Sequence, residues 1–231
     1  MSTTLAQKQH SLLDTGTLVE NIATKSADDI RLSLESIEQD FGPFDVRLGE
    51  SLLSAGDLLA ESGDYESAKS YFERALYINR LNQGLYHETH IAIVERLIEC
   101  DVAAQDWESV NDHYGHLQFL YSRLYEQGSD KWIHGIAQVS DWHIVALNHH
   151  LGGDRLEHLR IANRLFRQRL TLAQEQGNVS AEGLAILQHN VDATAQQLRT
   201  GGESDHEVTQ VRVFSRIDSR RHDADRSLAL E

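Results

Sequence analysis

The sequence predicts an all-α protein, an α-solenoid of antiparallel helix hairpins with about three repeats and a capping helix. Three observations lead to this prediction. The 231 residues include a single Pro and many unbranched residues that lose little freedom in a helix. Apolar residues recur at helical spacing along most of the chain. One stretch of sequence also reappears 42 residues further on.

The expected helices follow one another through short turns that contain Gly, Asp or Asn. Ser26 and Asp29 resemble a capping box at the start of the first helix, and Gly42-Pro43 ends it. Asp64 and Ser180 are the expected N-caps of two later helices. The helices are expected at residues 27–41, 45–61, 65–80, 88–104, 107–125, 131–151, about 156–170 and 181–198.

This order of elements predicts three regions. A helical lead-in occupies residues 1–44, a helical repeat domain occupies 45–200, and a flexible charged tail occupies 201–231, where apolar residues are few. Within the tail, the segment 208–217 (VTQVRVFSRI) combines β-branched residues with two Arg, and could dock on a partner or on the chain's own acidic surface.

The repeat aligns SGDYESAKSYF (62–72) with AQDWESVNDHY (104–114). The Asp is expected to cap the second helix of a hairpin, the small residue to allow close helix approach, and the later aromatic residue to fill the groove to the next pair. An ordinary amphipathic bundle would not require a second copy. The aligned pairs are Asp64 with Asp106, Tyr65 with Trp107, Ala68 with Val110, and Phe72 with Tyr114.

These positions carry a resemblance to a known family. With Gly56, Gly63, Asp64, Tyr65, Ala68, Phe72, Ala75 and Leu76, the chain resembles the tetratricopeptide repeat (TPR) family. The resemblance is strong over 49–82, moderate over 91–125 and degenerate over 132–173. Arg80 replaces the usual Pro and Gln105 replaces the turn Gly. The spacing of 42 resembles the longer-linker, kinesin-light-chain-like subtype, and the chain also resembles uncharacterised bacterial TPR proteins, many of them envelope-associated.

The resemblance implies that the first helix of each repeat lines a concave groove. It places Glu50, Leu53, Asp57 and Glu61 on that face, and the 42-residue shift adds Ala92, Glu95, Glu99 and Ala103. An acidic groove implies a protein or peptide partner that is basic or amphipathic. Carboxylates in place of Lys and Asn argue against a clamp for acidic tails. The alternative is that these carboxylates form only a solvated helix face.

Composition excludes other classes of partner. The net charge of −15 argues against nucleic acid and against anionic membrane surfaces. No apolar run approaches the roughly 20 residues that cross a bilayer. The start of the chain lacks the pattern of a secretion signal, which favours the cytoplasm. A signal peptide already removed would instead favour the bacterial periplasm.

No motif indicates catalysis, a metal or a cofactor. Cys100 lies mid-helix among apolar residues, and neither a nucleophile elbow nor a phosphate-binding loop is present. The pairs His87/His90, His113/His116 and His149/His150 supply two ligands each, whereas zinc requires three or four. We therefore expect a non-catalytic interaction scaffold. The alternatives are a self-assembling structural subunit and, third, a metal enzyme built on the His pairs.

Overall fold

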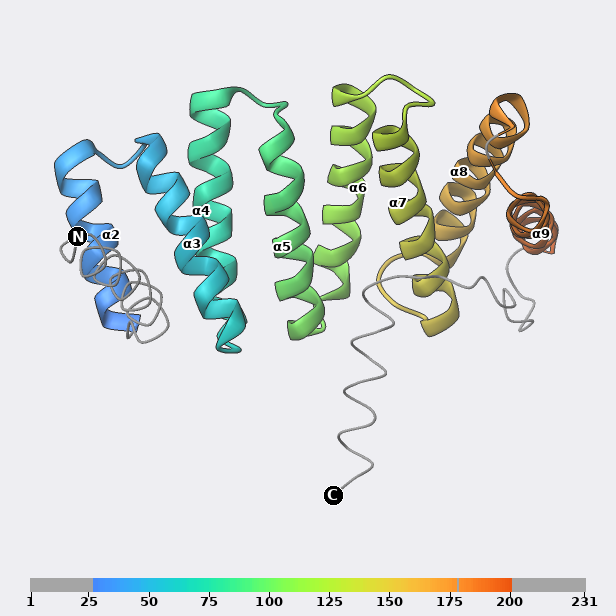
Figure 1. The fold of residues 1–231 in the computed structure, drawn as a ribbon. Helices are drawn as coiled ribbons and strands as arrows, with labels where there is room; N and C mark the ends of the chain where they lie inside the picture. Colours follow the sequence, from blue (N-terminus) through green and yellow to red (C-terminus); the bar gives the residue numbers. More distant parts are fainter. Residues whose placement is uncertain (1–26, 178, 201–231) are drawn as a thin grey trace, which may run out of the picture. The chain divides into compact units, whose positions relative to one another are not determined.

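The computed structural model describes residues 27–177 and 179–200, and within these ranges the protein is all-α, as predicted (Figure 1). No strand occurs in this part of the chain. The expected capping box at Ser26, the lead-in before it and the charged tail lie outside the described residues. The helices are α2 (Ala27–Phe41), α3 (Val46–Glu61), α4 (Tyr65–Gln83), α5 (Glu88–Ala104), α6 (Trp107–Leu124), α7 (Asp130–His149), α8 (Arg155–Gln176) and α9 (Ala181–Arg199).

The chain divides between Leu85 and Tyr86 into two compact units. In unit 1, α2 and α3 pack on one another, and α3 packs on α4. Their shared core contains Ile30 and Leu34 from α2, and Leu48 and Leu52 from α3. The segment 27–41 is therefore part of the same hydrophobic core as the hairpin that follows it.

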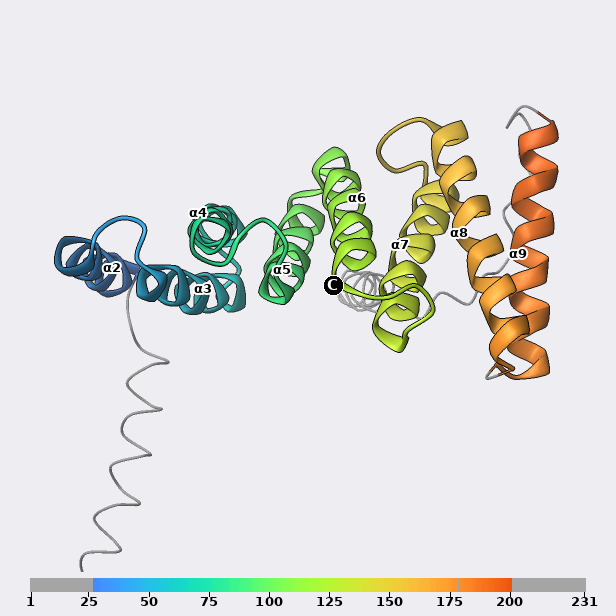
Figure 2. The ribbon, with the colours of Figure 1, turned by 90° about the horizontal axis from the view of Figure 1, so that it is seen from above.

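In unit 2 each helix from α5 to α9 packs on the next one along the chain. Figures 1 and 2 show this succession from two directions. The last helix, α9, covers an apolar cluster through Leu187 and Val191, while its other side exposes Gln188 and Asp192 to solvent. The last helix therefore has one apolar side, which packs on α8, and one polar side.

The predicted correspondence between the two copies is confirmed at the helix starts. Asp64 caps α4 and Asp106 caps α6, and each side chain accepts a hydrogen bond of 3.2 Å from the backbone N–H three residues later. The two caps share φ −82°, with ψ 70° and 77°. Ser180 likewise caps α9.

The packing positions of the copies agree as well. Ala68 and Phe72 are buried in unit 1, as are Val110 and Tyr114 in unit 2. Phe72 lies directly against Gly56 of α3, where a Cβ would come within 2.5 Å of its ring. These side chains hold helices together and are not available to a ligand.

Two helices end at a left-handed residue that is not glycine, although glycine is the usual residue in this conformation. Gln105, where the resembling family has Gly, adopts the left-handed conformation with φ 56° and ends α5. His150 does the same at the end of α7, with φ 53°. A non-Gly residue tolerates this conformation at modest cost.

A cluster of aromatic rings and histidines occupies the interior of unit 2. The Trp142 ring stacks on Tyr114 with centroids 5.1 Å apart, and its indole N–H donates to Asn111 Oδ1 at 3.2 Å. Beside it, His143 Nδ1 and His158 Nδ1 lie 2.8 Å apart.

The neighbours of this pair determine the tautomers. The Nε2 of His158 contacts the carbonyl oxygen of Gly152, which can only accept, so Nε2 carries the proton. In the neutral ring Nδ1 of His158 is then the acceptor, and His143 donates to it. Burial first, then the His158 and Arg164 charges, lower the pKa of His143 to about 3.

Because the pKa of buried His143 is low, we expect the stability of the protein to depend on pH. Because the folded pKa is below the ordinary value near 6.5, the unfolded chain takes up the proton first as the pH falls. The contribution of neutral His143 to the free energy of unfolding is complete above about pH 6.5. It is lost as the pH falls toward 3, by about 1.4 kcal/mol per pH unit. His143→Asn keeps a donor but cannot titrate, so urea unfolding between pH 7 and 4.5 should show a shallower loss. Parallel curves for the two proteins would refute the assignment.

Candidate functional site

The first set of predicted groove residues lies along α3 in unit 1. Glu50 and Glu61 are exposed, whereas Leu53 and Asp57 are half-buried. Leu53 packs partly against the core cluster of this unit. The four side chains therefore form a solvent-accessible acidic strip on one helix, with one apolar member.

The second predicted set lies on α5 in unit 2. Glu95 and Glu99 are half-buried, and Ala92 and Ala103 are exposed. Glu95 accepts a hydrogen bond of 3.0 Å from the Gln138 side chain of α7, so these helices are joined along this face.

Glu95 and Ala92 line a hollow of about 410 Å³, which we call the α5–α7 pocket. Its lining comes from α5, from α7 and from the C-terminal end of α6, where Tyr121 and Tyr125 lie. Of its four α5 residues, the sequence predicted Ala92 and Glu95 as groove residues, but neither Glu88 nor Ile91, and it predicted neither tyrosine. Its lining residues are Glu88, Ile91, Ala92, Glu95, Tyr121, Tyr125, Asp130, Lys131 and His134.

The α5–α7 pocket is acidic with one paired cation. Lys131 donates to Glu88 at 3.0 Å, and its side-chain hydrogen bond holds the pKa of that carboxyl below its usual value. Both side chains are more than half exposed, so solvent screens the pair and a competing cation can exchange with Lys131. Burial, followed by the Glu95 charge, raises the pKa of Tyr121 to about 12, which keeps its hydroxyl protonated.

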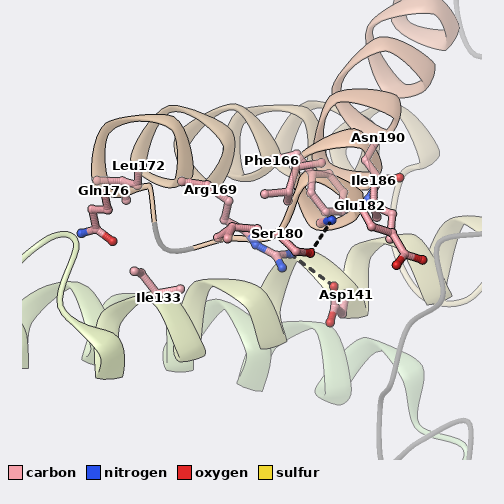
Figure 3. A pocket seen from close by; sticks show the side chains of 14 residues that line it. Ile133, Asp141, Phe166, Arg169, Leu172, Gln176, Ser180, Glu182, Ile186 and Asn190 are labelled. Atoms are coloured by element: carbon pink, nitrogen blue, oxygen red, sulfur yellow. Dashed lines mark hydrogen bonds and ion pairs between the residues drawn. The ribbon is translucent and has the colours of Figure 1, made fainter.

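A second pocket, of about 550 Å³, lies between α7, α8 and α9 and was not predicted from the sequence (Figure 3). We call it the α7–α9 pocket. Arg169 of α8 donates to Ser140 Oγ at 2.7 Å and to Asp141 Oδ1 at 3.4 Å. Burial is the largest influence on both charges, since it raises the pKa of Asp141 and lowers that of Arg169. The pocket is lined by Ile133, Asp141, Phe166, Arg169, Leu172, Ala173, Gln176, Val179, Ser180, Glu182, Gly183, Ile186, Leu187 and Asn190.

Asp141 connects this pocket to the predicted groove pattern. A further shift of 42 residues takes Glu99 to position 141. Asp130, His134 and Asp141 recur at helical spacing and so share one side of α7. The first two line the α5–α7 pocket and the third lines the α7–α9 pocket.

The histidine pairs do not assemble into a metal centre in the part of the chain that the structure describes. There, no three side chains of His, Cys, Asp or Glu are grouped to hold a metal ion. His113 contacts Asp101 at 2.8 Å, and His87 caps α5 by accepting from the Thr89 N–H. Cys100 is buried and is not part of a disulfide. No helix among the described residues is long and apolar enough to cross a membrane.

Comparison with known proteins adds no family. No protein-family model matches the chain. No curated protein matches it either.

Proposed function

We propose that this protein is a non-catalytic interaction scaffold, a TPR-like α-solenoid that binds a basic or amphipathic peptide segment of a protein partner. The binding surface in unit 2 is the α5–α7 pocket, which Glu95 lines, together with Glu99 on the same helix. The acidic strip of Glu50, Leu53, Asp57 and Glu61 on α3 is a second surface of the same character.

The observation that carries this proposal is the composition of the α5–α7 pocket. Its lining includes three carboxylates, Glu88, Glu95 and Asp130, and two aromatic residues, Tyr121 and Tyr125. Carboxylates attract Lys or Arg side chains, and aromatic lining residues accept their apolar stems or a neighbouring apolar residue. Lys131 already lies 4.9 Å from the Tyr125 ring centroid, which is the contact a partner's cation would make.

The solenoid arrangement is supported by the contact order of unit 2. Each helix there packs mainly on its neighbours in the chain, as expected for stacked repeats. The matching caps at Asp64 and Asp106 support a repeated hairpin. No described feature favours the self-assembling subunit, which stays an untested alternative.

The experiment begins with a peptide selected from a displayed library on the immobilised full chain. Its affinity is then measured by fluorescence anisotropy. Glu95→Lys/Glu99→Lys should weaken binding about tenfold or more, because it reverses one charge in the pocket lining and a second charge on the same helix. Raising the salt concentration should weaken wild-type binding as well.

The matched control is Asp112→Lys/Glu175→Lys. Asp112 lies on α6 and Glu175 on α8, and both are exposed. Their replacement by Lys changes the net charge by the same amount as Glu95→Lys/Glu99→Lys does. This control should bind as wild type does. If the two double variants lose affinity equally, the peptide responds to overall charge and the α5–α7 pocket is not the site.

A further inference from the structure

We propose that the C-terminal segment 208–222 (VTQVRVFSRIDSRRH) binds in the chain's own α5–α7 pocket and competes there with the partner peptide. This inference rests on the proposed function, because it assigns an occupant to the same pocket. The segment itself lies outside the described residues. It is assigned to the pocket by its charge, by the lining of the pocket and by the length of chain between the two.

The composition of segment 208–222 matches the ligand class proposed for the α5–α7 pocket. It contains four Arg and one Asp, a formal charge of +3, in a chain whose net charge is −15. Arg212 and Arg216 stand among apolar residues, which are Val211, Val213, Phe214 and Ile217. The segment is therefore both basic and apolar, and its charge favours contact with an acidic surface of the same chain.

The lining of the α5–α7 pocket supplies groups that an arginine-containing segment requires. Of the described residues that line it, Lys131 is the one Lys or Arg, and it pairs with Glu88. Both of these side chains are more than half exposed, and Asp130 is exposed as well, so an incoming side chain can reach them from solvent. A guanidinium group forms paired hydrogen bonds with a carboxylate and stacks on aromatic rings, such as those of Tyr121 and Tyr125.

The chain leaves α9 beside the C-terminal end of α7. Arg155 joins the two helix ends, since it donates to Leu147 O of α7 at 3.1 Å and to Gln197 Oε1 of α9 at 3.0 Å. The α5–α7 pocket lies toward the opposite end of α7, where Asp130 and Lys131 belong to the first turn (Figure 1). The segment must therefore run back along α7 to reach the pocket.

The length of chain after α9 is sufficient for this path. His134 in the pocket lies about 21 Å along α7 from Asn148, at the helical rise of about 1.5 Å per residue. Because α9 packs on α8 and α8 on α7, the path also crosses two helix-packing distances, about 20 Å, which gives a straight line of about 30 Å. Arg212 and Arg216 follow Thr200 by 12 and 16 residues, which span up to about 40 and 53 Å.

Weak binding is sufficient because the segment and the pocket belong to one chain. A short linker gives an effective concentration of about 1 mM. If the free segment binds with a Kd of about 100 μM, the tethered segment occupies about 90% of the pockets and weakens the binding of a competing peptide about tenfold.

The test uses the full chain and the free peptide 208–222, labelled and followed by fluorescence anisotropy at physiological salt. In Arg212→Glu/Arg216→Glu the chain's own segment is repelled by the acidic pocket. The free peptide should therefore bind this variant about tenfold more tightly than wild type. Equal affinity for the two proteins would overturn the proposal.

The matched control is Arg160→Glu/Arg226→Glu, which changes the net charge by the same amount. Arg160 is exposed on α8, and Arg226 follows the segment in the chain. This control should bind the free peptide as wild type does. A gain as large as that of Arg212→Glu/Arg216→Glu would show that overall charge causes the effect and would overturn the proposal.

Adding Glu95→Lys to the Arg212→Glu/Arg216→Glu chain locates the binding. The gain in affinity for the free peptide should disappear, and its persistence would place the segment elsewhere and overturn the proposal. The library-selected peptide separates the two proposals. If it depends on Glu95 and Glu99 but binds wild type and Arg212→Glu/Arg216→Glu equally, the proposed function stands and the occupant is wrong. If it does not depend on Glu95 and Glu99, the proposed function itself fails.

Disulfide formation distinguishes the chain's own segment from that of a second copy. Val213→Cys is combined with His134→Cys in the pocket or with Asn148→Cys at the other end of α7, while Cys100 is buried. Asn148 is nearer to the end of α9, so a segment that does not bind the pocket should bridge faster to position 148. We expect faster bridging to position 134, in a product of monomer mass. Faster bridging to position 148, or a disulfide-linked dimer, would overturn the proposal.

Discussion

Replacing Gly135 by Ala is expected to lower the free energy of unfolding by about 3 kcal/mol, because it overpacks a rigid contact. Gly135 lies on α7 directly against Tyr121 of α6. An added Cβ would come within 2.1 Å of the ring carbon Cγ, which is bonded to the Tyr121 Cβ and can move only if the whole ring moves. The Tyr121 side chain is 5% exposed and has little room to withdraw. The helices must therefore separate, and urea unfolding followed by circular dichroism measures the loss.

Gly115→Ala is the matched control for this change. Gly115 also lies inside a helix, α6, but nothing stands within 4 Å of an added Cβ. Alanine there should raise stability by about 0.5–1 kcal/mol, because it restricts the unfolded chain. The double variant Gly135→Ala/Tyr121→Ala should lose less than the sum of its parts, since the clash disappears with the ring. Strict additivity would contradict the described contact.

Trp142→Ala is expected to cost about 3–5 kcal/mol, as removal of a large buried aromatic side chain usually does. The ring is 1% exposed, stacks on Tyr114 and donates to Asn111. Its loss leaves a cavity between α6, α7 and α8 and removes the partner of the Asn111 oxygen. The same urea assay at pH 7 measures the effect.

Trp142→Phe separates packing from hydrogen bonding in this cluster. It keeps an aromatic ring against Tyr114 but has no N–H, so a loss of about 1–3 kcal/mol is expected. Phe119→Ala tests a ring outside the cluster. Because Phe119 is 42% exposed, its removal should cost clearly less than removal of Trp142. Equal losses at the two positions would refute the central role of Trp142.

The helices could be predicted because their ends are encoded locally. The bounds of α5 agree with the predicted 88–104, and Asp64, Asp106 and Ser180 cap helices as expected. The end of α7 was placed two residues too late, at 151 instead of His149. The sequence signal there is Gly152-Gly153, but the left-handed residue that ends the helix is His150, a residue type that adopts this conformation less readily than glycine.

The two pockets differ in how far the sequence could reach them. The family resemblance, shifted by the 42-residue repeat, predicted Ala92 and Glu95 of the first pocket, because both lie on one helix. The second pocket depends on Asp141, Arg169 and Asn190 from three helices, and no short motif joins them. A polar Asn190 beside the apolar Leu187 and Val191 was the available signal. Only the fold shows that Asn163 is satisfied and Asn190 is not.

The division of the chain at Leu85 has a spectroscopic consequence. All three tryptophans of the protein, Trp107, Trp132 and Trp142, follow that boundary, so unit 1 contains none. Emission excited at the red edge of the indole band therefore reports on unit 2 alone, whereas far-ultraviolet circular dichroism reports on the helices of both. Comparing the two signals during one denaturant titration counts the cooperative transitions without any label.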